Sequence, residues 1–198
     1  MPALRRSYDS SSRAAAAEAS RERILEAAFA LLREHHYDAV TIKEIAARAG
    51  VSAQTVVNQV GGKAQLIEAV FLWHQPREAS LRAVPSGDPH DAALAICGRY
   101  EELGPATLRL QAIEEREPVA ASLLEAGRRE HTAWVERTFG PRLPAEASAR
   151  RLALAALTAA YDLSTWAVLR RALDPAETVT AMAALARGVL DSPSPGLS

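Results

Sequence analysis

Two amide side chains, Gln54 and Asn58, have the residue type and the spacing for a specific binding chemistry. They lie four residues apart, so on a helix they share one face. An amide donates and accepts hydrogen bonds at the same time, and this combination matches the N6 and N7 atoms of adenine in the major groove of DNA. This chemistry requires a short helix at these residues whose polar face is uncovered.

The surrounding residues 41–60 predict two short helices joined by a glycine turn. Thr41 and Glu44 have the spacing of a capping box, which starts the first helix. Gly50 can adopt the left-handed conformation that ends it, and Ser52 is a good N-cap for the second. An ordinary helical hairpin in an all-α core has the same local features, so the segment alone leaves both interpretations open.

The flanking residues extend the pattern. Apolar residues from Ile24 to Leu31 follow helical spacing, which predicts an amphipathic helix that begins near Ser20. Lys63 follows a glycine pair and begins another helix, where free N–H groups and a positive charge together suit a phosphate. Residues 20–73 resemble the TetR/AcrR family of bacterial transcriptional regulators. The resemblance rests on ILEAAFALL, on T-x-x-x-I-A-x-x-A-G-V-S at residues 41–52, on Thr55, on G-K-x-x-L at residues 62–66, and on AAYDLSTWAVLRRAL followed by DPAE near the C-terminus.

The resemblance implies an all-α protein in which an N-terminal three-helix helix-turn-helix DNA-binding domain precedes a helical ligand-binding and dimerisation domain. We expect a mobile arm at residues 1–19, the DNA-binding domain at 20–73 with its motif at 41–60, the second domain at 74–191 and a tail at 192–198. The arm is either a DNA contact or a plain disordered tail. The residues expected to face DNA are Thr41, Lys43, Ser52, Ala53, Gln54, Thr55, Val57, Asn58 and Lys63.

The chain departs from the family pattern at three places. The family usually has an aromatic residue at the position of Val57, where it contacts a DNA phosphate, so that contact is lost here. The family often has His-Phe in place of Gln59 and Val60, and Gly in place of His36. Losing one phosphate contact lowers affinity for all sequences without removing base readout.

The composition places few limits on function. The net charge of the 198 residues is −1, and residues 1–75 hold nine basic against eight acidic side chains, so charge alone does not indicate nucleic acid. Cys97 is the only cysteine, which excludes an intramolecular disulfide and fits a reducing compartment. The sequence has neither a signal-peptide pattern nor an apolar run long enough for a membrane span. We therefore expect a cytoplasmic protein.

The C-terminal half carries a second pattern. We expect one helix over residues 145–173, and between Leu152 and Leu169 its only charged residue is Asp162. A helix that is apolar all round must be covered on more than one face, either inside a monomer or by a second subunit. Two such helices from each of two subunits would form a four-helix homodimer interface, as the resemblance implies. The expected interface residues are Leu152, Leu157, Ser164, Val168, Val179, Met182, Ala186 and Val189.

The resemblance also implies a small-molecule pocket in the second domain, for an unknown apolar or aromatic ligand. The candidate lining residues, each of which could instead be ordinary core, are Trp73, Cys97, Tyr100, Leu110, Ile113, His131, Trp134, Tyr161 and Trp166. We find no catalytic or metal-binding pattern and expect no cofactor. Residues 61–63 lack the spacing of a P-loop, and Cys97 with His131 is better explained by core packing than by a nucleophile and its base.

The sequence therefore favours a homodimeric, ligand-released repressor of a palindromic operator. An activator, a dimeric small-molecule-binding protein with weak or lost DNA binding, and an α-helical enzyme are the alternatives.

Overall fold

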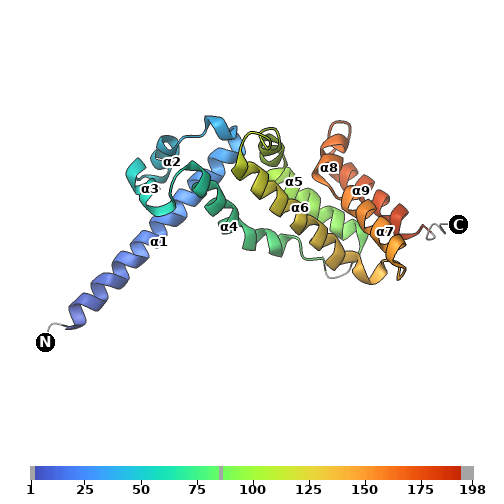
Figure 1. Ribbon diagram of the computed structural model, residues 1–198, viewed down its shortest axis with the longest axis horizontal. Helices are drawn as coiled ribbons and strands as arrows, with labels where there is room; N and C mark the ends of the chain where they lie inside the picture. Colours follow the sequence, from blue (N-terminus) through green and yellow to red (C-terminus); the bar gives the residue numbers. More distant parts are fainter. Residues whose placement is uncertain (1–2, 85–86, 193–198) are drawn as a thin grey trace. The chain divides into compact units, whose positions relative to one another are not determined.

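Helices form every regular element of the computed structural model, which describes residues 3–84 and 87–192 (Figure 1). The predicted all-α class is confirmed. The predicted tail at 192–198 lies, except for its first residue, outside the described residues. The elements in order are α1 (Ala3–Glu34), η1 (Tyr37–Ala39), α2 (Ile42–Ala49), α3 (Ala53–Val60), α4 (Lys63–Leu81), α5 (Pro89–Gln111), α6 (Pro118–Phe139), η2 (Gly140–Arg142), α7 (Ala147–Ala160), α8 (Leu163–Leu169) and α9 (Pro175–Leu190).

The chain folds as two units, and each unit is made of two separate segments of the sequence. The first, which we call the reading unit, consists of Met1–Gln75 and Arg109–Ala120. The second, which we call the body unit, consists of Pro76–Leu108 and Ala121–Ser198. The connection between α5 and α6 therefore belongs to the reading unit.

The reading unit is held together by apolar side chains from α1 to α4. Ile24, Ile45, Val56 and Leu66 each come from a different helix and are almost completely buried in one cluster. Full burial of such a side chain contributes about 1.5–3 kcal/mol. This shared core fixes α2 and α3 against α1.

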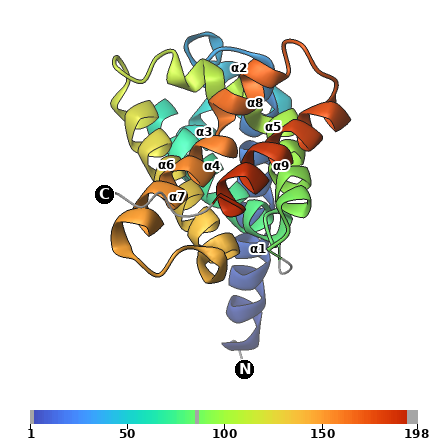
Figure 2. The same cartoon turned by 90° about the vertical axis from the view of Figure 1, so that its right-hand side faces the viewer.

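Helix α1 is longer than the sequence pattern predicts. It begins at Ala3 and not near Ser20, and Figures 1 and 2 show its N-terminal turns extending beyond α2, α3 and α4. Residues 3–19 contain neither Gly nor Pro, and they include a run of four Ala, the strongest helix former. The backbone therefore continues as a helix without an apolar face to bury. The mobility of residues 1–19 stays a prediction.

The body unit packs α5 and α6 together with α7, α8 and α9 around an aromatic core. Ile96, Phe139, Leu157, Tyr161 and Met182 are its largest fully buried apolar and aromatic members. Helices α7 and α9 contact each other, and they lie next to each other in Figure 2. Asp174 caps α9, because its side chain accepts from Glu177 N in a capping box.

The predicted C-terminal helix is wrong. The expected helix over residues 145–173 is two helices, α7 and α8, bent by 47° at a break where Asp162 accepts from Ser164 N and caps α8. The only charged residue of the apolar stretch is therefore a helix cap. Gly104 and Pro105 do not interrupt α5: both residues lie within the helix, where Gly104 is buried.

No single helix among the described residues has the length and apolar composition to cross a membrane. Helices α7 and α8 have that length and apolar composition only when they are taken together as a bent pair.

Candidate functional site

The helix-turn-helix forms as its local sequence predicts. Thr41 Oγ1 accepts from Glu44 N at 3.2 Å, and Glu44 Oε2 accepts from Thr41 N at 2.9 Å, so the capping box is confirmed. Gly50 ends α2 with φ of 68°, in the left-handed region that favours glycine. Ser52 Oγ accepts from Thr55 N at 3.0 Å and starts α3. These caps fix both ends of the turn between α2 and α3.

The polar face of α3 is uncovered. Ser52, Ala53, Gln54, Val57 and Asn58 are exposed, and Val57 is 44% exposed. On the opposite face, Val56 is completely buried against the core of the reading unit. Burial of Val56 thus holds α3 with its polar residues facing outward.

Gln54 and Asn58 are already paired with each other. Gln54 Nε2 donates to Asn58 Oδ1 at 2.8 Å. This leaves Gln54 Oε1 as an acceptor and the Asn58 amide group as a donor, both on the exposed face. The two side chains therefore present one acceptor and one donor side by side.

The other predicted DNA-facing residues differ in how exposed their side chains are and in what they contact. Thr41 and Lys43 are exposed, and Thr55 is half-buried. Lys63 is half-buried: its Nζ donates to the carbonyl oxygen of Asp38 at 3.4 Å and lies 4.2 Å from the centre of the Tyr37 ring. Burial lowers the pKa of Lys63. Its ammonium is thus held against η1, which the sequence did not indicate.

Three arginines that sequence reasoning missed hold the ends of α1 and α2. Arg48 forms a two-pronged ion pair with Glu34 at 3.2 and 3.3 Å, which ties α2 to α1. Arg23 Nε donates to the Ala49 carbonyl at 3.5 Å. Arg109, in the last turn of α5, donates to the carbonyl oxygen of Arg33 at 2.5 Å and to that of Leu32 at 3.4 Å. These carbonyls belong to the last turn of α1, where helix geometry leaves carbonyl groups for partners outside the helix.

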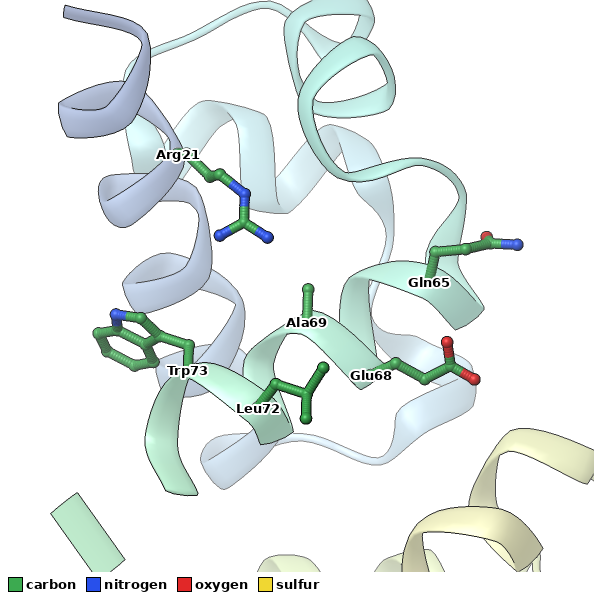
Figure 3. Close-up of a pocket in the computed structure, with 6 residues that line it drawn as sticks. All are labelled: Arg21, Gln65, Glu68, Ala69, Leu72 and Trp73. Carbon is green, nitrogen blue, oxygen red and sulfur yellow. The ribbon is translucent and has the colours of Figure 1, made fainter. Parts of the chain in front are cut away.

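A surface depression of about 390 Å³ lies between α1 and α4 of the reading unit (Figure 3). Arg21 of α1 points toward α4, and Gln65, Glu68, Ala69, Leu72 and Trp73 of α4 complete its lining. Only Trp73 was among the predicted site residues. The depression is open to solvent and its rim is charged, unlike the closed apolar cavities that usually hold small molecules.

The candidate ligand residues are divided between the two units. Trp73, Leu110 and Ile113 belong to the reading unit. The other six are buried in the core of the body unit, namely Cys97, Tyr100, His131, Trp134, Tyr161 and Trp166. Six of the nine predicted ligand residues therefore lie in one unit, as buried residues of its core.

Most polar atoms of these six residues have partners within the body unit. Tyr100 donates to the Tyr161 carbonyl at 3.0 Å, and Tyr161 donates to the Pro89 carbonyl at 2.9 Å. Cys97 Sγ donates to Met182 Sδ at 3.4 Å, and burial raises the pKa of its thiol to about 12. Cys97 is therefore a neutral core residue. The described part of the chain has no group of three or more metal-ligating side chains placed to hold an ion.

A family model for the bacterial regulatory proteins of the tetR family matches residues 24–70, which contain α2 and α3 and parts of α1 and α4. Residues 24–70 are therefore similar to the DNA-binding segment of the tetR family. The matched segment is the one whose caps, turn and exposed amides are described above.

Known proteins are similar to parts of this chain in sequence and to most of it in fold. An uncharacterized HTH-type transcriptional regulator of Bacillus subtilis (strain 168), YvkB, is 37% identical over 75 residues, which cover 38% of this chain and 40% of that protein. A tetR-family regulator from Streptomyces coelicolor has the same fold, with a TM-score of 0.67 and 23% identity over 91% of this chain and 92% of that one. A structure of SmeT with triclosan has a TM-score of 0.61 and 23% identity over 86% and 90%.

The predicted dimer-interface residues divide into a buried group and an exposed group. Leu157, Val179, Met182 and Ala186 are buried in the body unit's own core and are not available on its surface. Val189 is half-buried. Leu152, Ser164 and Val168 are exposed, as is Leu185, which was not predicted. Periodicity alone could not tell the inner face of these helices from their outer face.

Proposed function

We propose that the chain is a cytoplasmic transcriptional repressor that binds a palindromic operator as a homodimer and is released by a small-molecule ligand. The observation that carries this proposal is the capped turn between α2 and α3, which presents Gln54 and Asn58 together on an exposed face. Helix-turn-helix proteins place these N-terminal residues of the second helix against base edges.

The amide pair suits adenine. Adenine offers the N6 amino group as a donor and N7 as an acceptor in the major groove. The mutual bond leaves Gln54 Oε1 free to accept and the Asn58 amide free to donate. The pair is therefore complementary to adenine without breaking its own hydrogen bond, and two copies related by two-fold symmetry would read a palindrome.

The proposed dimer uses the exposed apolar residues of the body unit. Leu152 is 48% exposed, Val168 61% and Leu185 49%, on α7, α8 and α9. Large apolar side chains that remain exposed on neighbouring helices are typical of a surface that a partner covers. A second copy is the partner that a two-fold operator requires.

The proposed ligand acts on the body unit. A structure of SmeT in complex with triclosan has a similar fold, and the body unit of this chain has a core that contains aromatic side chains. A ligand that binds better to the form unable to grip DNA must weaken DNA binding to the same extent.

The test is selection of bound sequences from random DNA with the full chain. A palindromic product that contains adenine in each half-site is expected. Gln54→Ala or Asn58→Ala should lower discrimination at one position by about 1–3 kcal/mol. Gln75→Ala, an exposed amide at the far end of α4's reading-unit segment, is the matched control and should bind normally. Identical selectivity of all four proteins would contradict the proposal.

A second candidate function, a dimeric small-molecule-binding protein with weak or lost DNA binding, has support from two residues. Val57 offers no phosphate contact, and Lys63 is held by the Asp38 carbonyl and the Tyr37 ring. No enrichment in the selection experiment, with intact ligand binding, would favour this candidate.

A further inference from the structure

Val57 of α3 is an exposed apolar side chain on the face of the helix that carries the two amides. It is 44% exposed, whereas its neighbour Val56 is completely buried in the core of the reading unit. Val57 is therefore not needed for the packing of α3. Single exposed apolar residues are common on protein surfaces, so exposure alone assigns no role to it. The side chains around it on α3 indicate one.

The exposed face of α3 has two rows of side chains that lie side by side. Gln54 and Asn58 form an amide row, held together by the hydrogen bond of 2.8 Å from Gln54 Nε2 to Asn58 Oδ1. Ala53 and Val57 are also four residues apart and exposed, and they form an apolar row. Each row is displaced from the other by one residue, so an object that lies against one row also meets the other.

A valine in the major groove has one suitable partner on the base edges. Its side chain neither donates nor accepts a hydrogen bond, so it offers nothing to a phosphate oxygen or to a base nitrogen or oxygen. Among the groups that the base pairs present in the major groove, the C5-methyl of thymine is the apolar one. An apolar contact is favourable because it removes both surfaces from water. Val57 therefore favours thymine over the other bases.

The two rows together are complementary to A·T base pairs. The major-groove edge of such a pair presents N7 and N6 of adenine and the O4 and methyl group of thymine. The amide row is complementary to adenine, as argued above for the mutual bond of Gln54 and Asn58. Because the rows are adjacent, amides placed on an adenine bring Val57 to the thymine of the same pair or of the next pair.

We propose that Val57 is a specificity-determining residue that reads the C5-methyl group of one thymine in each half-site of the operator. This inference deepens the proposed function and rests on it. The contact differs in kind from the phosphate contact that an aromatic residue makes at this position, because a phosphate contact carries no sequence information and a methyl contact does.

The test removes one methyl group from the DNA at a time. Each thymine of the operator obtained by selection is replaced in turn, in both half-sites, by deoxyuridine, which lacks only the C5-methyl. Binding of the full chain is measured by fluorescence anisotropy. Loss of one buried methyl weakens binding roughly fourfold, so the symmetric replacement should weaken it roughly sixteenfold at the thymine that Val57 reads. Equal affinity for thymine and uracil at every position would overturn the proposal.

Val57→Ala tests whether Val57 is the residue that contacts the methyl. The side chain is exposed and Ala is a better helix former, so α3 should stay folded, which circular dichroism verifies. The variant should bind the thymine operator about as weakly as the wild type binds the uracil operator, and should no longer distinguish them. Any effect of uracil on DNA shape persists in the variant, so the non-additivity of the two changes isolates the contact. A thymine preference that survives in Val57→Ala contradicts the proposal.

Leu72→Ala is the matched control. Leu72 is 64% exposed on α4 of the same unit, and its truncation should leave the full thymine preference. Loss of the preference in this variant would also contradict the role of Val57. The failure of this inference is distinct from that of the proposed function: the absence of any selected operator would remove both, whereas a palindromic operator that binds equally well with uracil removes only the role of Val57.

Discussion

Two glycines of α5 should respond in opposite ways to the same substitution. Gly98 is exposed in the middle of the helix, and a Cβ atom added there would meet nothing within 4 Å. Gly98→Ala therefore removes only the conformational freedom of glycine. Ala is about 1 kcal/mol more favourable than Gly inside a helix, so the variant should be stabilised by about that amount.

Gly104 lies six residues later, where α8 crosses the helix. A Cβ atom at Gly104 would lie 2.7 Å from Trp166 Cζ3 and 2.9 Å from Cη2. The indole cannot swing aside easily, because it is 6% exposed and its Nε1 donates to Glu101 at 3.2 Å. Overpacking of a core costs about 1–3 kcal/mol, and the gain of about 1 kcal/mol in helix propensity offsets part of it. Gly104→Ala should therefore be neutral to destabilising by about 2 kcal/mol.

Thermal unfolding followed by circular dichroism compares the two variants directly. Their free energies of unfolding should differ by about 1–3 kcal/mol. For a chain of this size, each kcal/mol shifts the Tm by roughly 2–4 °C. Trp166→Phe in the Gly104→Ala background should recover part of the loss, because the smaller ring withdraws the clashing atoms. Equal stabilisation by both substitutions would refute the described packing of α8 on α5.

Three further predictions concern function and pH. Leu152→Arg should give folded monomers by light scattering, whereas Leu157→Arg should unfold the body unit, since Leu157 is 0% exposed; a folded, dimeric Leu152→Arg would contradict the proposed interface. Val57→Tyr should tighten binding to every DNA sequence alike, measured by fluorescence anisotropy, and unchanged affinity would show that the missing aromatic contact is unimportant. The lowered pKa of buried His131 contributes stability that is present above pH 6.5 and is lost as the pH falls below it, because the unfolded chain takes up the proton first. Urea unfolding at pH 7.5 and 5.5 should therefore show a smaller pH effect in His131→Gln than in wild type, and equal effects would oppose this assignment.

The reading unit could be predicted from sequence because its signals are local. Thr41, Gly50 and Ser52 act within three or four residues of themselves, and each has the predicted conformation or hydrogen bond. The outward direction of Gln54 and Asn58 follows from burial of Val56 on the opposite face, which helical periodicity also indicates.

The faces of the C-terminal helices could not be predicted, because they are apolar all round. Leu152 and Leu157 differ by five residues and look equivalent in sequence, yet one is half exposed and the other fully buried. The break at Asp162 could not be predicted from the sequence either. An isolated Asp inside a long apolar run is compatible with a continuous helix, and only its hydrogen bond to Ser164 N identifies it as a cap.

Arg109 shows why the unit boundaries also escape a sequence reading. It lies 76 residues from Arg33, whose carbonyl it caps, and no spacing rule relates positions so far apart. Its neighbours Arg116 and Glu117 likewise act on η1: Arg116 lies 3.8 Å from Asp38, and Glu117 raises the pKa of Tyr37 after the larger effect of burial. Charged residues in a connection between two helices normally indicate a solvated loop. Here Arg109, in the last turn of α5, donates to a carbonyl at the end of α1, and Arg116 and Glu117 act on η1 beside Lys63. Residues 109–120 are thus part of the unit that carries α2 and α3.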